Sequence, residues 1–191
     1  NGIFLYAYVL MDVWSRKIVG WEIHSEESEA HARDFFRRVA TAYNVEGVHL
    51  HADNGNAMKG VTILALFFSL VILPSYSRPR VSNDNPFSES LFKTVKFRPG
   101  YPRRFKDMHH ARQWFADFTN WYNTEHRHSG IGYITPNARH EGRAPEIMSR
   151  RNQVLSDARK AHPERWPNGQ MQWEEHPVVY LNPDPTTRES I

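Results

Sequence analysis

Two carboxylates, Asp53 and Glu89, are the residues whose surroundings point most directly to chemistry. Asp53 follows the short apolar run 48–51 and opens the turn tripeptide Asp-Asn-Gly, which predicts a carboxylate at the carboxyl end of a strand. Open α/β sheets bind their ligands at that edge. Glu89 follows Pro86, a residue suited to the first turn of a helix. If the two carboxylates bind one metal site, their hard oxygen atoms and the absence of cysteine favour Mg²⁺ as the ion, with Mn²⁺ as a substitute.

Each carboxylate also has a plainer explanation when it is considered alone. Asp-Asn-Gly can be a turn and nothing more, and Glu89 can be an ordinary exposed helix residue. The spacing of 35 intervening residues and the strings around both positions favour the metal site. These strings are His-Ala-Asp-Asn-Gly at 51–55, Asp-Asn-Pro-Phe-Ser-Glu-Ser-Leu-Phe-Lys at 84–93 and Trp-Tyr-Asn-Thr-Glu-His-Arg-His-Ser-Gly at 121–130.

With these strings, residues 3–142 resemble the DDE transposases of bacterial insertion sequences, which are relatives of the retroviral integrase core. The resemblance implies an α/β, ribonuclease-H-like fold with a mixed sheet flanked by helices. It implies that Asp53 and Glu89 are two of three carboxylates that bind catalytic Mg²⁺ or Mn²⁺. The activity implied is metal-dependent phosphodiester cleavage and strand transfer at the ends of a DNA element.

The resemblance leaves the third carboxylate without a counterpart. In the family, the first catalytic Asp lies on a strand that precedes the equivalent of residues 3–11, and that strand is missing from this sequence. Asp12 matches a family position in a hairpin turn that is not a metal ligand. We therefore expect a core that lacks its first strand, and we expect its catalytic competence to depend on that strand.

Basic residues are concentrated in the middle of the chain and predict a DNA partner. Residues 76–165 contain 17 Lys and Arg against 9 Asp and Glu, a net charge of +8. Such a segment favours a polyanion, although part of any such excess is simply solvated surface. Lys93 and Lys96 share a helix face with Glu89, and Arg78 and Arg80 lie in the loop before it, so these four residues are the candidates for contact with double-stranded DNA.

Composition excludes several classes of protein. The chain has 191 residues, 40% of them hydrophobic, and no cysteine, which rules out disulfides and cysteine-ligated zinc or iron–sulfur sites within it. The longest apolar run, 61–73, is too short to span a bilayer. Together with the resemblance, which implies a bacterial homo-oligomer, these features lead us to expect a cytoplasmic protein that does not contact membranes.

Periodicity and turn signals predict the elements that would position the carboxylates. Strands are expected at 3–11, 16–23, 48–51 and 70–73, the last ended by Pro74. A helix capped by Ser25 should run from 26 to 43 and bury the stripe Ala30, Phe35, Val39 and Ala42. A helix at 58–68 should precede the fourth strand, and residues 75–83 should form a loop that enters the Glu89 helix, where Asp84 is a capping candidate.

The remainder of the chain is expected to be helical and then irregular. The aromatic spacing of 107–122 predicts a helix with a buried face, and Pro145 suits the first turn of a basic helix over 144–161. We expect a catalytic core at 1–142, a linker helix at 143–161, and at 162–191 an irregular tail or the start of a C-terminal module, with one strand candidate at 178–181. His126 and His128 could be metal ligands or acid–base residues, but the resemblance implies a structural or DNA-end role, and that interpretation is favoured.

Two other functions remain open from the sequence. A chain with two of three carboxylates can be a catalytically incomplete relic that binds DNA without cutting it. A ribonuclease-H-like fold can also belong to a nuclease that hydrolyses DNA and never joins it, because a fold does not determine its reaction.

Overall fold

A computed structural model of the chain describes residues 4–53, 55–78, 84–166 and 172–181. Contacts between Cα atoms divide these residues into two compact units. The first contains Val19–Phe118 together with the strand that ends at Met11, and the second contains Asp12–Ile18 and Thr119–Tyr180. The main elements, in chain order, are β1 (Tyr6–Met11), β2 (Ile18–His24), α1 (Glu29–Ala42), β3 (His49–Ala52), α2 (Val61–Ser69), β4 (Leu73–Tyr76), α3 (Pro86–Phe97), α4 (Met108–Thr124), α5 (Pro136–His140) and α6 (Ala144–Ala161).

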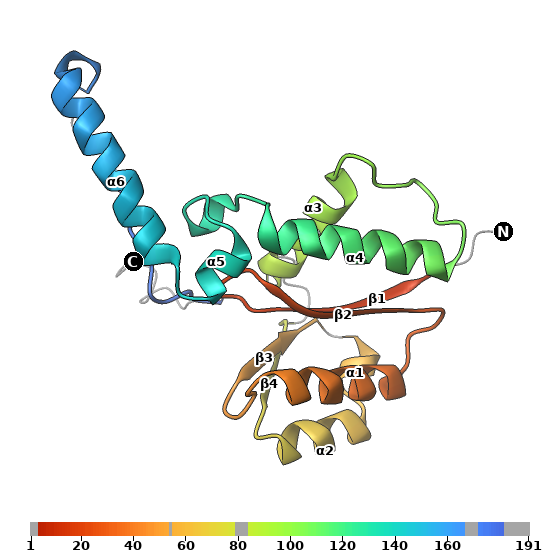
Figure 1. Ribbon diagram of the computed structural model, residues 1–191. Coiled ribbons are helices and arrows are strands. Elements are labelled where there is room, and N and C mark those ends of the chain that lie inside the picture. Colours follow the sequence, from red (N-terminus) through yellow and green to blue (C-terminus); the bar gives the residue numbers. More distant parts are fainter. Residues whose placement is uncertain (1–3, 54, 79–83, 167–171, 182–191) are drawn as a thin grey trace. The chain divides into compact units, whose positions relative to one another are not determined.

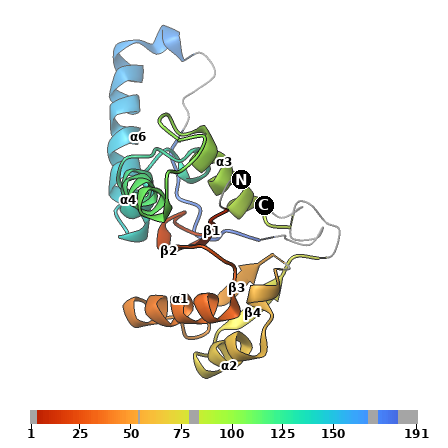
Figure 2. The ribbon, with the colours of Figure 1, turned by 90° about the vertical axis from the view of Figure 1, so that its right-hand side faces the viewer.

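In the first unit, β2 contacts helices on both of its faces. Successive side chains of a strand point to opposite faces of a sheet. Gly20 faces α1 so closely that a Cβ atom there would lie 2.7 Å from Val39 Cγ2, whereas the ring of Trp21 lies 5.1 Å from that of Phe115 on α4. Figures 1 and 2 show β2 between these two helices. A small residue at position 20 is therefore required by the approach of α1.

The main core of this unit lies between α1, α2 and the strands β3 and β4. Its buried side chains are those of Ala32, Phe35, Phe36, Val39, Leu50, Ala57, Ile63, Phe67 and Ile72. Figure 1 shows α1 and α2 side by side below β1 and β2. Phe35 and Val39 are buried as the sequence predicted, but Ala30 and Ala42 are exposed, so that part of the predicted stripe was wrong.

The start of α1 also differs from the sequence prediction. Ser28, and not Ser25, is the N-cap, and its side chain accepts a hydrogen bond of 3.1 Å from the backbone N–H of His31. The Tyr8 hydroxyl donates to the Ser28 carbonyl at 3.1 Å and accepts from the Ser28 N–H at 2.9 Å. A contact from β1 therefore decides which of two serines caps the helix.

The strands form two separate pairs in the part of the chain that the structure describes. β1 pairs with β2, and β3 pairs in parallel with β4, with His49 opposite Leu73 and Ala52 opposite Tyr76. β4 begins three residues later than expected and contains Pro74 instead of ending there. A proline is tolerated at the edge of a sheet because its missing N–H removes no bond to the neighbouring strand.

The second unit is built around the turn between β1 and β2. Asn123 holds this turn through two buried hydrogen bonds: its Oδ1 accepts from the Ile18 N–H at 3.0 Å, and its Nδ2 donates to the Ile18 carbonyl at 2.9 Å. A small core is formed by Ile131, Ile134, Ala144 and Met148. α6 covers the range expected for the basic helix, but residues 178–181 do not form the predicted strand.

None of the helices within the described ranges is both long and apolar enough to cross a membrane.

Candidate active site

Asp53 stands at the carboxyl end of β3, as the sequence predicted. β3 and β4 run in parallel, so their carboxyl ends lie at the same edge, and the Ser77 N–H continues the pairing with a bond of 3.0 Å to the Ala52 carbonyl. The Asp53 side chain is exposed, and its Oδ1 accepts a hydrogen bond of 3.0 Å from the Gly55 N–H. This hydrogen bond holds the carboxylate in the turn through Oδ1.

Glu89 lies in the first turn of α3, as predicted. Pro86 occupies the start of the helix, where a missing N–H costs nothing, and the Glu89 N–H donates to the Asn85 carbonyl at 3.2 Å. The Glu89 side chain is exposed. A carboxylate in the first turn is stabilised by the positive end of the helix dipole.

A groove in the first unit is lined both by Asp53 and by residues at the N-terminus of α3. Its volume is about 240 Å³. Its wall consists of residues 6–10 of β1, residues 50–53 at the end of β3, and Asn85, Ser88 and Phe92 around the start of α3, with side chains of α1 below. Glu89 directly follows Ser88 but is not itself part of the lining. Asp53 and the first turn of α3 therefore border the same groove.

Glu27 is the second acidic residue that lines this groove, beside Asp53, and it was not predicted as a site residue from the sequence. A Cβ atom at Gly55 would lie 3.0 Å from Asp53 Oδ1 and 3.5 Å from Glu27 Oε1, so both carboxylates border the same turn. Only the tertiary fold brings them together. The described residues nevertheless contain no group of three or more His, Cys, Asp or Glu arranged to hold a metal ion.

Asp84 does not cap α3, and this part of the sequence interpretation was wrong. The N-cap position is occupied by Asn85, which makes no side-chain capping bond. The buried Asp84 carboxylate instead accepts hydrogen bonds from Arg78, at 2.8 Å from Nε, 2.7 Å from Nη2 and 2.7 Å from the backbone N–H. These bonds lower the pKa of Asp84 to about 2 and raise that of Arg78.

The four candidate DNA contacts have different surroundings. Lys93 and Lys96 are exposed on α3, one and two turns beyond Glu89. Arg78 is engaged with Asp84, although two thirds of its side chain remains exposed. Arg80 lies outside the described residues.

His128 is the N-cap residue of the short 3-10 helix Ser129–Ile131 in the second unit. Its Nδ1 accepts a hydrogen bond of 3.1 Å from the Gly130 N–H and so bears no proton. Burial, reinforced by the positive charge of Arg16, lowers the His128 pKa to about 4. The ring is therefore neutral near pH 7, and it is partly buried.

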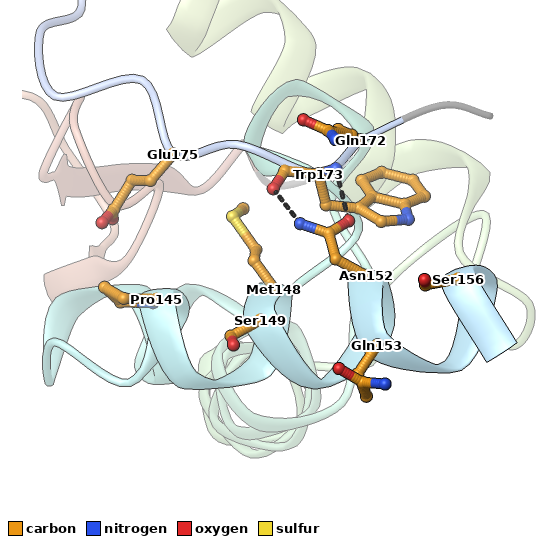
Figure 3. A pocket seen from close by; sticks show the side chains of 9 residues that line it. All are labelled: Pro145, Met148, Ser149, Asn152, Gln153, Ser156, Gln172, Trp173 and Glu175. Atoms are coloured by element: carbon orange, nitrogen blue, oxygen red, sulfur yellow. Dashed lines mark hydrogen bonds between the residues drawn. The ribbon is translucent and has the colours of Figure 1, made fainter. Parts of the chain in front are cut away.

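The second unit has a cavity of about 530 Å³ between α6 and residues 172–175, drawn in Figure 3. Asn152 clamps the backbone of Trp173 there, accepting from its N–H at 2.8 Å and donating to its carbonyl at 2.9 Å. The remaining lining side chains are mostly neutral: Pro145, Met148, Ser149, Gln153, Ser156 and Gln172, with Glu175 as the one carboxylate. This cavity contains no acid–base pair and no set of metal ligands.

Comparisons with known proteins agree on one family. Two family models, both described as integrase core domain, match residues 1–82 and 70–136. The transposase for insertion sequence element IS904 of Lactococcus lactis subsp. lactis (strain IL1403) is 31% identical over 134 residues, which is 69% of this chain and 53% of that protein. The chain spans about half the length of the curated relatives it matches.

Solved structures agree on the fold. The catalytic core domain of BIV integrase has a TM-score of 0.55 at 19% identity and covers 74% of this chain and 89% of its own. A chain from the simian T-cell lymphotropic virus intasome in complex with PP2A regulatory subunit B56 gamma has a TM-score of 0.56 at 15% identity, covering 91% of this chain and 53% of its own. These similarities confirm the α/β, ribonuclease-H-like fold expected from the sequence.

Proposed function

The chain belongs to the integrase core domain family of DDE-type transposases, and from this premise we propose that it supplies the catalytic core for cutting and joining DNA at the ends of an insertion sequence element. The observation that carries the proposal is the groove that is lined both by Asp53, at the end of β3, and by Asn85 and Ser88 at the start of α3. Glu89 lies in the first turn of α3. The proposed substrate is double-stranded DNA, both at the element ends and at the target.

Asp53 and Glu89 are the proposed ligands for Mg²⁺, with Mn²⁺ as a substitute. Their exposed carboxylates offer the hard oxygen atoms that these ions prefer. When bound, such ions neutralise charge on the entering and leaving oxygens of a phosphodiester exchange. Asp53 is oriented for this role by the Gly55 N–H, which occupies Oδ1.

A third ligand is proposed to come from a further strand seated in the groove between β1 and β3. Within the described residues β1 pairs with β2 and β3 pairs with β4, and the groove is lined by β1 and by the end of β3, each of which has one edge that is not paired with its partner strand. Open strand edges readily accept another extended segment. Such a strand, from sequence encoded before Asn1 or from another copy of the chain, would place a carboxylate beside Asp53.

DNA binding is proposed for the basic face of α3. Lys93 and Lys96 are exposed, and residues 76–165 have a net charge of +8. Exposed lysines near the reacting carboxylates would hold phosphates without reading sequence. A homo-oligomer in the bacterial cytoplasm is the proposed working form, since two element ends must be held in one complex.

A catalytically incomplete relic that binds DNA is the second candidate. It is favoured by one observation: no group of three metal-ligating side chains is present within the described residues.

The deciding experiment is a joining assay with DNA that carries the element ends. The proposal predicts covalent joining of a 3′-hydroxyl end to a target duplex in Mg²⁺ or Mn²⁺, abolished by Asp53→Asn and by Glu89→Gln. Hydrolysis without joining would replace the proposal with a nuclease. DNA binding with neither reaction, even when the upstream sequence is included, would replace it with the relic.

A further inference from the structure

His51 connects three segments of the first unit. Its Nδ1 lies 2.7 Å from Ser75 Oγ on β4, and its Nε2 lies 2.9 Å from the backbone carbonyl of Asp84. A carbonyl oxygen can only accept, so Nε2 bears the proton and donates it. In the neutral ring, Nδ1 then accepts from the Ser75 hydroxyl. One side chain of β3 thus holds both its neighbouring strand and the residue just before the N-cap of α3.

Asp84 is also held through its side chain. Arg78 binds the Asp84 carboxylate with two guanidinium nitrogens and its own backbone N–H. Arg78 directly follows Ser77, whose N–H extends the β3–β4 pairing. The Asp84 side chain is only 3% exposed. The residue that precedes the N-terminus of α3 is therefore bound to both strands. The Asp84 carbonyl binds β3 through His51, and the Asp84 carboxylate binds the segment after β4 through Arg78.

We propose that His51, Arg78 and Asp84 are positioning residues that fix the start of α3, and with it Glu89, against the end of β3 that bears Asp53. His51 precedes Asp53 by two residues, and Asp84 precedes Glu89 by five. The two carboxylates come from different elements, and the three residues form the hydrogen-bonded connection between those elements. This role takes the place of the DNA contact predicted for Arg78, and its metal-binding consequence rests on the proposed function.

The physical basis is the need to hold ligands from separate elements in one arrangement before an ion binds. Residues that orient metal ligands without touching the ion affect affinity by about 10–100-fold when they are removed. Loss of His51 or of the Arg78–Asp84 pair should therefore weaken Mn²⁺ binding although both carboxylates remain.

Hydrogen–deuterium exchange of the metal-free chain tests the positioning directly. His51→Ala, Arg78→Ala and Asp84→Ala should each accelerate exchange in the first turn of α3. His49→Ala is the matched control, because His49 is exposed on the same strand. His51→Gln should restore protection, since its amide can donate to the Asp84 carbonyl. Unchanged exchange in all three alanine variants would overturn the proposal.

Metal and DNA titrations separate positioning from the alternative role of Arg78. Positioning predicts that Arg78→Ala and Asp84→Ala weaken Mn²⁺ binding alike, by about 10-fold, and that the double variant is no worse than either. If Arg78 instead contacts phosphate, Arg78→Ala alone will weaken DNA binding and reduce its salt dependence, while Asp84→Ala will leave Mn²⁺ affinity unchanged. That result would overturn the proposal.

The exchange measurement also distinguishes failure of the proposal from failure of the proposed function. Absence of Mn²⁺ binding in the unaltered chain, with exchange accelerated as expected, would contradict the metal site and leave the positioning of α3 intact. Mn²⁺ binding that depends on Asp53 and Glu89 but not on His51, Arg78 or Asp84 would contradict the positioning and leave the metal site intact.

Discussion

At the scale of single residues, the turn between β1 and β2 shows how a carboxylate can serve structure and not chemistry. Asp12 Oδ2 accepts from the hydroxyl of the fully buried Ser15 at 2.5 Å and lies 3.2 Å from His140 Nδ1. Burial alone would raise the Asp12 pKa, but hydrogen bonds from Ser15, His140 and the Trp14 N–H outweigh it and lower the pKa. The sequence resemblance assigned Asp12 no metal, and these bonds give it a structural role.

The lowered pKa of Asp12 predicts a stability effect that depends on pH. A carboxyl group with a depressed pKa in the folded state stabilises the protein above its unfolded pKa of 3.8 and loses that contribution as pH falls. Asp12→Asn should therefore cost about 1–2 kcal/mol at pH 7 and progressively less below about pH 4. Urea unfolding at several pH values measures this difference.

Asp117→Asn is the control for that series, because Asp117 is an exposed helix residue and its replacement should change stability by less than about 0.5 kcal/mol. A cost of Asp12→Asn that stays constant from pH 7 to pH 3 would refute the assigned bonds.

At the scale of elements, α2 buries one of two adjacent phenylalanines and exposes the other. Phe67 is 1% exposed and packs edge-on against Phe36 at 5.1 Å, whereas Phe68 is 87% exposed. The apolar run 61–73 predicted a buried helix, but an almost uniformly apolar sequence has no polar face from which to read the orientation of the helix. The core formed by α1 decides which phenylalanine is buried.

The orientation of α2 predicts unequal effects of two alanine substitutions. Phe67→Ala should lower the free energy of unfolding by about 3–5 kcal/mol, because it leaves a cavity in the main core. Phe68→Ala should change it by less than about 0.5 kcal/mol. Chemical denaturation of both variants gives the comparison. Equal losses would mean that Phe68 is covered in solution.

The same scale shows why element boundaries were harder to predict than elements. The strands and helices around Asp53 and Glu89 were anticipated from apolar runs and turn residues. The cap of α1 at Ser28 and the shift of β4 to Leu73–Tyr76 depend on Tyr8 and on pairing with β3, respectively. Contacts between distant segments leave no local pattern, so the sequence alone could not reveal them.

At the scale of the whole molecule, the proposed site combines residues that are far apart in the chain. Asp53 and Glu89 were nominated from flanking strings, and the structure brings Asp53 and the turn that bears Glu89 to one groove. Glu27 and His51 were not nominated: Glu27 belongs to no motif, and the string that begins at His51 does not reveal the contacts of His51 with Ser75 and Asp84. The basic segment was visible from composition, but its assignment to DNA depends on the family.

The charge of that segment predicts how DNA binding responds to salt. Each lost phosphate contact should reduce the slope of log K against log salt by about 0.9 for duplex DNA. Replacing Lys93 and Lys96 together by Gln should therefore lower affinity and reduce the slope by about 1.8. Fluorescence anisotropy at several salt concentrations measures both quantities.

The matched control for the salt series is the double replacement of Arg37 and Lys59, which are exposed and lie outside the basic segment. If the Lys93/Lys96 variant keeps the slope of the unaltered chain, the basic face of α3 does not contact DNA.

The most direct test of a metal site at Asp53 and Glu89 is a measurement of Mn²⁺ binding to this chain in the presence of element-end DNA. Binding is monitored through the electron paramagnetic resonance signal of the free ion. The account predicts that Asp53→Asn and Glu89→Gln each weaken binding at least about 10-fold, because each removes one of two exposed carboxylate ligands. Asp117→Asn should leave binding unchanged. Equal Mn²⁺ affinity in all four proteins would contradict a metal site at Asp53 and Glu89.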